Sequence, residues 1–160
     1  MKLEPVRLLF LCTHNACRSQ LAEALTRHLA GPEIEVASAG SQPSRELHPL
    51  TLKILSERQI DHSNLYSKSW DQLSDFDPDI VITVCDQAAG ESCPVWFGKA
   101  IKAHWGLPDP SRIDDAEQQN KIVSHVMKTL DNRISRLLAS NITTLDKQAL
   151  SELLHQLEKC

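Results

Sequence analysis

Residues 6–29 read VRLLFLCTHNACRSQLAEALTRHL, and this stretch decides the fold. Its first part, Val6–Leu11, is apolar except for Arg7, which is the pattern of a buried strand in a parallel sheet. Residues 19–29 then place leucine and alanine at helical spacing, and Gly31-Pro32 stops the helix. A strand, a loop and a helix in this order are the first unit of an α/β fold.

The same alternation continues along the chain. We expect further strands at 34–39, 79–85 and 100–105, and helices at about 49–58, 116–140 and 145–159. Thr143 and Asp146 stand at capping-box spacing before the last helix. The sequence predicts one α/β domain over residues 1–160, an open parallel sheet of about four strands with helices on both faces. Ligands bind such sheets at the carboxyl ends of the strands, where Cys12, Cys85 and the loop of Asp109 fall.

The composition is that of an ordinary globular protein, with 41% apolar and 24% charged residues and a formal net charge of -4. Lysine and arginine are spread thinly, so nucleic acid is not an expected partner. No segment approaches the roughly 20 apolar residues that span a bilayer, so no membrane association is expected. Glu4 and Arg7 interrupt the opening residues, which we interpret as a strand and not a signal peptide.

The chain contains five cysteines, an odd number that does not suit a purely structural set of disulfides. Without an export signal, we expect a cytoplasmic protein in which the cysteines have catalytic or redox roles. Nothing in the sequence indicates an oligomer, and we take a monomer as the default.

The loop between the first strand and the first helix has the pattern C-x5-R-S, from Cys12 to Ser19. Backbone N–H groups of such a loop and of the helix start converge on a tetrahedral oxyanion, and the planar fork of Arg18 can hold two of its oxygens. The same field is expected to lower the pKa of Cys12 from about 8.5 to roughly 3.5–7.5 and make it a nucleophile. Ser19 can donate a hydrogen bond to its thiolate, and Asn15 tolerates a left-handed backbone. The expected oxyanion-binding residues are Thr13, His14, Asn15, Ala16, Cys17 and Arg18.

A simpler interpretation is that Cys12 merely ends a strand and Arg18 is a solvated helix residue. The strand, the helix, the serine and a distal acid together favour the functional interpretation. Cys17 is either a small buried packing residue, which we favour, or a redox group. Cys160 at the chain terminus is interpreted as incidental.

The segments CTHNACRSQLAEAL, Ser38-Ala39-Gly40 and Asp109-Pro110 resemble the low-molecular-weight protein tyrosine phosphatase superfamily over most of the chain. The resemblance implies that Cys12 attacks the substrate, Arg18 binds the oxyanion and Asp109 is the general acid. The chemistry also needs such an acid, because hydroxide and alkoxide leave slowly unless they are protonated. Phosphatases of this type carry aromatic residues after Asp-Pro, whereas this chain has Ser111-Arg112.

A second cysteine pair, Cys85 and Cys93, lies in VCDQAAGESCPVW. Two thiols that become a disulfide supply two electrons, which arsenate reduction requires. This stretch and AHWGLPDPS resemble the arsenate reductases of the superfamily. The resemblance implies that Cys12 attacks arsenate, that Cys85 attacks the Cys12 sulfur and releases arsenite, and that Cys93 then forms the final disulfide with Cys85. Thioredoxin, or glutaredoxin with glutathione, would reduce that disulfide, and phosphate or sulfate would compete for the anion loop.

Other interpretations of these cysteines stay open at this point. Cys85 could be an inert strand-end residue and Cys93 a surface thiol. A zinc site that includes His104 matches no common spacing, so we expect neither a metal nor a cofactor. The alternative functions are a low-molecular-weight phosphotyrosine protein phosphatase and a non-catalytic oxyanion-binding module.

Some related reductases hold a monovalent cation near the loop. The resemblance places Asn15, Glu23 and Ser38 at three of the ligand positions, but the fourth position, an aspartate in those reductases, is Lys68. We hypothesise that the ammonium group of Lys68 replaces the ion.

Overall fold

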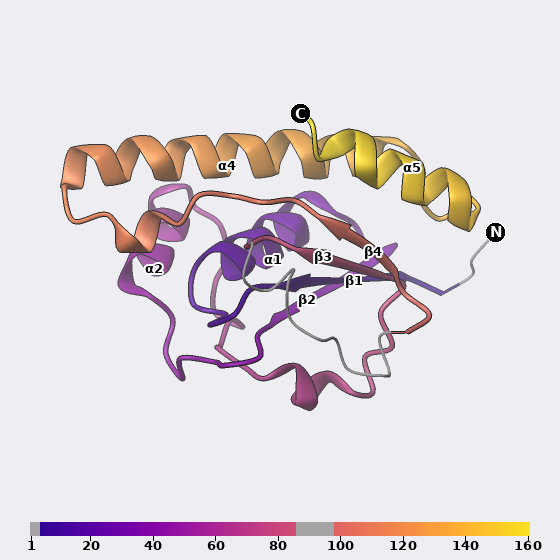
Figure 1. The fold of residues 1–160 in the computed structure, drawn as a ribbon, viewed down its shortest axis with the longest axis horizontal. Coiled ribbons are helices and arrows are strands. Elements are labelled where there is room, and N and C mark those ends of the chain that lie inside the picture. Colours follow the sequence, from indigo (N-terminus) through magenta and orange to yellow (C-terminus); the bar gives the residue numbers. More distant parts are fainter. Residues whose placement is uncertain (1–3, 86–97) are drawn as a thin grey trace.

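The computed structural model describes residues 4–85 and 98–160. Four strands form one parallel sheet in the order β2-β1-β3-β4, and the strand arrows in Figure 1 point to the same end. The strands are β1 (Val6–Leu11), β2 (Ile34–Ala39), β3 (Ile80–Thr83) and β4 (Ile101–His104). Leu11 lies beside both Ala39 and Thr83, and Thr83 lies beside His104. All four strands therefore end at nearly the same level, which confirms the predicted α/β sheet.

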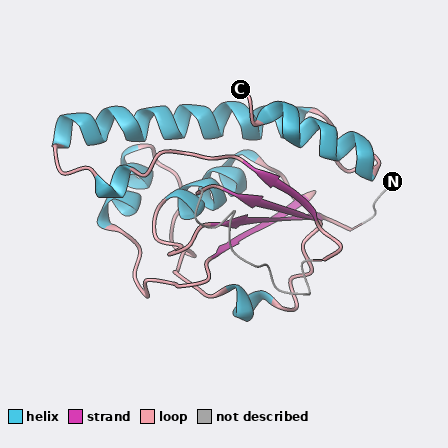
Figure 2. Ribbon diagram, viewed as in Figure 1, coloured by secondary structure: helices cyan, strands magenta, loops and turns pink. Residues whose placement is uncertain are grey.

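Helical elements cover both faces of this sheet, but unequally. They are α1 (Arg18–Leu29), α2 (Pro49–Glu57), η1 (Trp70–Leu73), η3 (Pro110–Arg112), α4 (Ala116–Ala139) and α5 (Lys147–Leu157). Helices α1, α4 and α5 share the larger core with alternate strand residues such as Phe10 and Ile82. The short helix η1 lies on the opposite side of the sheet (Figure 2), where Trp70 packs against a smaller core that contains Leu9 and Val81.

Most element boundaries differ from those expected by one or two residues, and three of these differences bear on the site or on a helix cap. Strand β3 ends at Thr83, so Cys85 lies two residues beyond it. Helix α1 begins at Arg18, one residue early. Helix α5 begins at Lys147, and its cap is Asp146, whose carboxylate accepts a hydrogen bond from the N–H of Ala149 at 2.8 Å. The capping box expected at Thr143 does not form, because that residue belongs to the turn before the cap.

Trp105 fixes the chain where it leaves β4. Its side chain is fully buried, stacks at a tilt against Phe10, and donates a hydrogen bond from Nε1 to the carbonyl of Leu154 at 3.1 Å. Two residues later, the N–H of Leu107 donates to the carbonyl of Val84 at 3.1 Å. These contacts hold the following loop, which carries Asp109, close to the end of β3.

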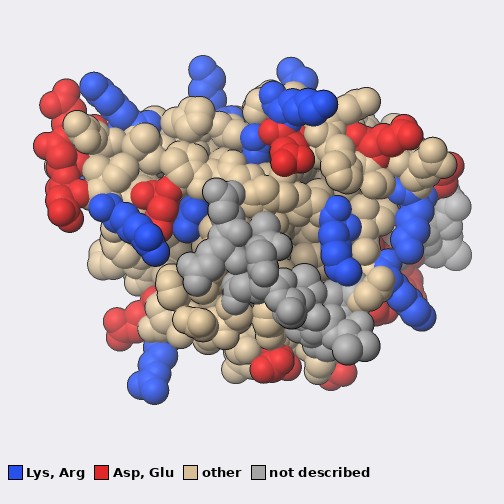
Figure 3. Space-filling model, in the orientation of Figure 1, with Lys and Arg blue, Asp and Glu red and all other residues tan. Residues whose placement is uncertain are grey.

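The surface in Figure 3 mixes the two signs of charge, and no continuous basic stripe crosses the described part of this face. Within residues 4–85 and 98–160, no helix has both the length and the apolar character that crossing a bilayer requires. The longest helix, α4, buries one face that includes Val126, Leu130 and Ile134 and exposes the rest.

Candidate active site

The loop after β1 is held from outside by the segment that follows β2. The N–H groups of Gln42, Ser44 and His48 donate to the carbonyls of Thr13, His14 and Ala16 at 2.9, 3.1 and 3.0 Å. In a trans peptide, the carbonyl and the next N–H point in opposite directions. The loop's following N–H groups therefore turn away from this segment, which is the orientation that an oxyanion cradle needs.

Gly40 allows the two segments to approach each other. A Cβ atom at this position would lie 2.4 Å from the carbonyl oxygen of Thr13 and 2.5 Å from that of Cys12. The backbone of Gly40 is also paired in both directions, since its N–H donates to Lys68 and its carbonyl accepts from Trp70. No residue with a side chain fits here unless the nucleophile loop moves.

Asn15 lies at the centre of the loop and is completely buried, with a φ of 49° that confirms the expected left-handed backbone. Its amide nitrogen donates to Ser19 Oγ at 2.8 Å and to Ser38 Oγ at 2.9 Å. Its amide oxygen accepts from Gln20 Nε2 at 2.8 Å and from the N–H of Lys68 at 3.0 Å. Every hydrogen-bonding group of the amide is used, which stabilises the strained backbone. Gln20 is a site residue that the sequence does not reveal, because a glutamine early in a helix carries no distinctive signal.

Cys12 and Cys85 meet although they are far apart in the sequence. Both side chains are buried and line the same cavity, and Cys85 Sγ lies 3.7 Å from the hydroxyl Oγ1 of Thr13, the residue after Cys12. The hydrogen bond with Cys85, followed by burial, raises the pKa of Cys12, and the charge of Arg18 opposes this shift without overcoming it. The expectation that the loop lowers the pKa of Cys12 is therefore wrong for the free, reduced site. That expectation considered the loop alone and omitted the neighbouring thiol.

Arg18 connects the nucleophile loop to the distal acid. Its Nη2 lies 3.3 Å from Asp109 Oδ2, and its Nη1 donates to the carbonyl of Leu107 at 3.0 Å. The other oxygen of Asp109 accepts hydrogen bonds from the N–H and the hydroxyl of Ser111 at 3.0 and 2.6 Å. In this structure the guanidinium therefore binds the acid loop.

A cavity of about 290 Å³ lies between these groups at the carboxyl end of the sheet. Its lining contains many of the residues expected from the sequence, namely Cys12, Thr13, His14, Arg18, Cys85 and Asp109, together with Leu107, Pro108 and Arg112. Asn15 and Ser19 lie outside this lining, fully buried. Cys93 falls outside the described residues.

Cys17 is a buried thiol on the protein side of the loop. Burial raises its pKa to about 11, although a hydrogen bond with Thr51 opposes the shift. Thr51 also donates to the carbonyl of Ala16 at 2.7 Å, so it supports two consecutive loop residues. Cys17 is thus a neutral thiol near neutral pH in the reduced protein, in keeping with the packing interpretation.

Lys68 lies behind the loop with an exposed fraction of only 4%. Its Nζ is 3.7 Å from Glu23 Oε1, donates to the carbonyl of Tyr66 at 3.1 Å, and stands 4.3 Å from the centre of the Tyr66 ring. Burial lowers the pKa of Lys68, and the carboxylate of Glu23 opposes that shift. Glu23 also accepts from Ser38 Oγ at 2.6 Å, so the ammonium group joins the network that holds Asn15.

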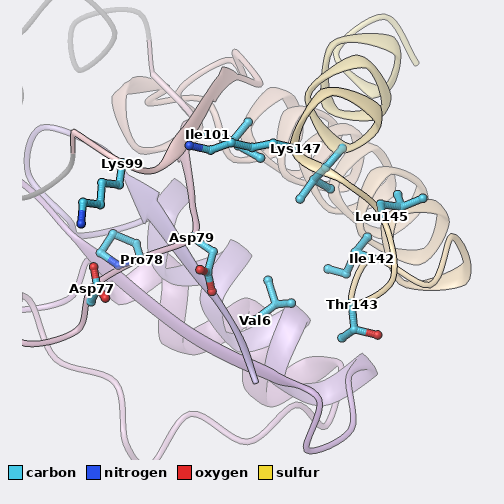
Figure 4. A pocket seen from close by; sticks show the side chains of 11 residues that line it. Val6, Asp77, Pro78, Asp79, Lys99, Ile101, Ile142, Thr143, Leu145 and Lys147 are labelled. Carbon is cyan, nitrogen blue, oxygen red and sulfur yellow. The ribbon is translucent and has the colours of Figure 1, made fainter. Parts of the chain in front are cut away.

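A second cavity, of about 260 Å³, lies at the opposite end of the sheet (Figure 4). Its lining includes Val6, Asp79 and Ile101 from the starts of the strands and Leu145 and Leu150 from the last part of the chain. No cysteine lines it, and a parallel sheet binds its ligands at the other end. In the parts of the chain that the structure describes, no cluster of three or more His, Cys, Asp or Glu side chains could hold a metal ion.

Comparison with known proteins agrees with this fold. Residues 7–152 match the low molecular weight phosphotyrosine protein phosphatase family, and the chain therefore belongs to that family. Within it, the chain is 36% identical to an arsenate reductase of Bacillus subtilis (strain 168) over 126 residues, which are 78% of this chain and 89% of that protein.

Two solved structures are also similar. A thioredoxin-dependent arsenate reductase of Corynebacterium glutamicum has a TM-score of 0.66 and 36% identity; the match covers 88% of this chain but 63% of that longer chain. An arsenate reductase in the phosphate binding state has a TM-score of 0.68 and 30% identity, covering 84% of this chain and 98% of the other.

Proposed function

We propose that this protein reduces arsenate to arsenite, and that residues 1–160 act as a single phosphatase-like arsenate reductase domain. The observation that carries the proposal is that Cys12 and Cys85 lie in the lining of one cavity beside Arg18. A phosphatase needs one nucleophilic thiol, whereas a reductase needs a second thiol within reach of the first. The arsenate reductases among its relatives support the same choice.

In the first step, arsenate binds in the loop, the thiol proton of Cys12 passes to an oxygen of the anion, and the resulting thiolate attacks arsenic. A sulfur–arsenic bond forms, and an oxygen leaves as water after it accepts a proton from Asp109. For this step Arg18 exchanges its contact with Asp109 for two oxygens of the anion, assisted by the N–H groups of residues 13–18, while Ser19 stabilises the thiolate. Phosphate and sulfate compete because they have the same tetrahedral shape.

In the second step, the Cys85 thiolate attacks the Cys12 sulfur. A disulfide forms, the sulfur–arsenic bond breaks, and its electron pair leaves with arsenic as arsenite. Two thiol sulfurs are oxidised by one electron each and arsenic gains two electrons. The Cys93 thiolate then attacks Cys85, which regenerates the Cys12 thiol and leaves a Cys85–Cys93 disulfide for thioredoxin, or for glutaredoxin with glutathione, to reduce.

We also propose that the protein works as a monomer in the cytoplasm. A thiol nucleophile such as the one proposed at Cys12 must stay reduced between turnovers, and a reducing compartment such as the cytoplasm keeps it so.

Arsenate-dependent oxidation of NADPH through thioredoxin and thioredoxin reductase tests the proposal. We expect turnover by the native protein, and we expect single-turnover mass spectrometry without reductant to find a disulfide between Cys85 and Cys93. Fast hydrolysis of an aryl phosphate without any arsenate-dependent oxidation would instead establish the phosphatase alternative. Slow hydrolysis alone would not, because the loop is common to both activities.

We further propose that the ammonium group of Lys68 takes the place of a bound monovalent cation. Two contacts support this. The ammonium group is buried beside Glu23, which accepts a hydrogen bond from Ser38, and the backbone N–H of Lys68 donates to the side chain of Asn15.

We expect potassium chloride to change the turnover of the native enzyme no more than choline chloride does. Lys68→Ser should lower turnover by about tenfold or more, since the loop loses its support, and potassium should restore part of the loss. Marked activation of the native enzyme by potassium would contradict the proposal.

A further inference from the structure

Arg112 is a second cation at the candidate active site, and neither the family pattern nor the relay uses it. It is the last residue of η3, directly after the loop of the proposed general acid. Its side chain is 75% exposed and lines the same cavity as Cys12 and Arg18. The residue therefore reaches the site from the solvent side, where a substrate enters.

Arg112 shares a carboxylate oxygen with Arg18. Nε of Arg112 lies 3.4 Å from Asp109 Oδ2, and Nη2 of Arg18 lies 3.3 Å from the same atom. One carboxylate charge is thus opposed by two guanidinium charges. When an anion enters the cavity, both guanidinium groups can exchange this carboxylate oxygen for oxygens of the anion.

The charges of substrate and product make this arrangement selective. Arsenate and phosphate carry up to two negative charges near neutral pH, whereas arsenous acid, the reduced product, is uncharged. Arg18 with the loop N–H groups binds at the floor of the cavity, and a cation at the mouth adds attraction for a multiply charged anion. The same cation gives no electrostatic attraction to the neutral product.

We propose that Arg112 is a specificity-determining residue that binds the outer oxygens of a small, multiply charged oxyanion. This inference rests on the proposed function for the identity of the substrate but not for the binding of the anion. Among residues 4–85 and 98–160, the lining of this cavity contains no phenylalanine, tyrosine or tryptophan, and it does contain the two guanidinium groups.

The test compares Arg112→Gln with Arg112→Lys. Isothermal titration calorimetry with inorganic phosphate measures anion binding to the reduced protein, and steady-state kinetics measures KM and kcat for arsenate. We expect Arg112→Gln to weaken phosphate binding and raise the KM about threefold to fivefold with little change in kcat, because an exposed ion pair contributes modestly. Arg112→Lys should stay within about twofold, and the loss in Arg112→Gln should shrink at high ionic strength. Arg58→Gln, at an exposed arginine outside the cavity lining, is the matched control.

Native phosphate affinity in Arg112→Gln would overturn the assignment, and so would a loss equal to that in Arg58→Gln. If both kcat and the melting temperature fell while the phosphate affinity stayed native, Arg112 would have a structural role. That outcome would also reject the assignment. If the native protein binds phosphate but never reduces arsenate, the proposed function fails. In that case a salt-sensitive loss of phosphate binding in Arg112→Gln still establishes Arg112 as an oxyanion-binding residue.

Discussion

Replacing Cys85 with alanine should reduce arsenate turnover by about a thousandfold or more. The sulfur that attacks Cys12, and so supplies electrons for the reduction of arsenic, is lost, and residues that act as one chemical unit lose nearly the whole rate when one is removed. The substitution leaves the Arg18 cavity and the Cys12 nucleophile in place, so inorganic phosphate should still bind. The coupled NADPH assay measures the first effect and calorimetry with phosphate the second.

The same variant tests the contact between the two thiols. Hydrogen bonding of the Cys12 thiol to Cys85 is the main cause that raises the pKa of Cys12, so its removal should lower that pKa. A lower pKa means more thiolate at a given pH, and alkylation of Cys12 by the neutral reagent iodoacetamide should begin at lower pH than in the native protein. Peptide mass spectrometry separates the alkylation of Cys12 from that of Cys17.

Cys160→Ala is the control, because Cys160 is an exposed thiol outside the cavity lining. This variant should keep native turnover and the native alkylation profile of Cys12. Full arsenate turnover in Cys85→Ala would exclude the relay. An unchanged alkylation profile in Cys85→Ala would show that the two thiols do not interact in solution.

The second large effect is expected from Gly40→Ala. The added methyl group would meet the carbonyl oxygens of Thr13 and Cys12, which are backbone atoms and cannot rotate aside. We expect the free energy of unfolding to fall by about 1–3 kcal/mol, as for other overpacked sites. Because the loop must shift to make room, we also expect turnover to fall about a hundredfold in the protein that remains folded. Urea titration and kinetics below the unfolding transition measure the two effects.

Gly31→Ala provides a matched control for this change. Its added Cβ would meet the carboxylate of Glu33 at 2.6 Å, the end of a flexible side chain that can rotate away. We therefore expect the stability to change by no more than about 0.5 kcal/mol and the turnover to stay native. If Gly40→Ala behaved like Gly31→Ala, the close approach of the two segments would not support the nucleophile loop.

Local sequence patterns were sufficient for the elements and for part of the site. Strand β1, the loop and helix α1 follow from an apolar run, a C-x5-R-S motif and helical spacing, since each depends on neighbouring residues. The parallel order of strands then placed Cys12, Cys85 and Asp109 at one end of the sheet. Short elements such as η1 gave no such signal, because a single turn has no periodicity.

Only the tertiary structure decided which groups touch. The pKa of Cys12 depends on Cys85, the orientation of Arg18 depends on Asp109, and the conformation of Asn15 depends on Lys68 and Ser38. These partners are distant in sequence, and hydrogen bonds and ion pairs act over a few ångströms. A sequence pattern can therefore name the residues of this site, whereas their protonation and pairing follow from contacts that exist only after the sheet has formed.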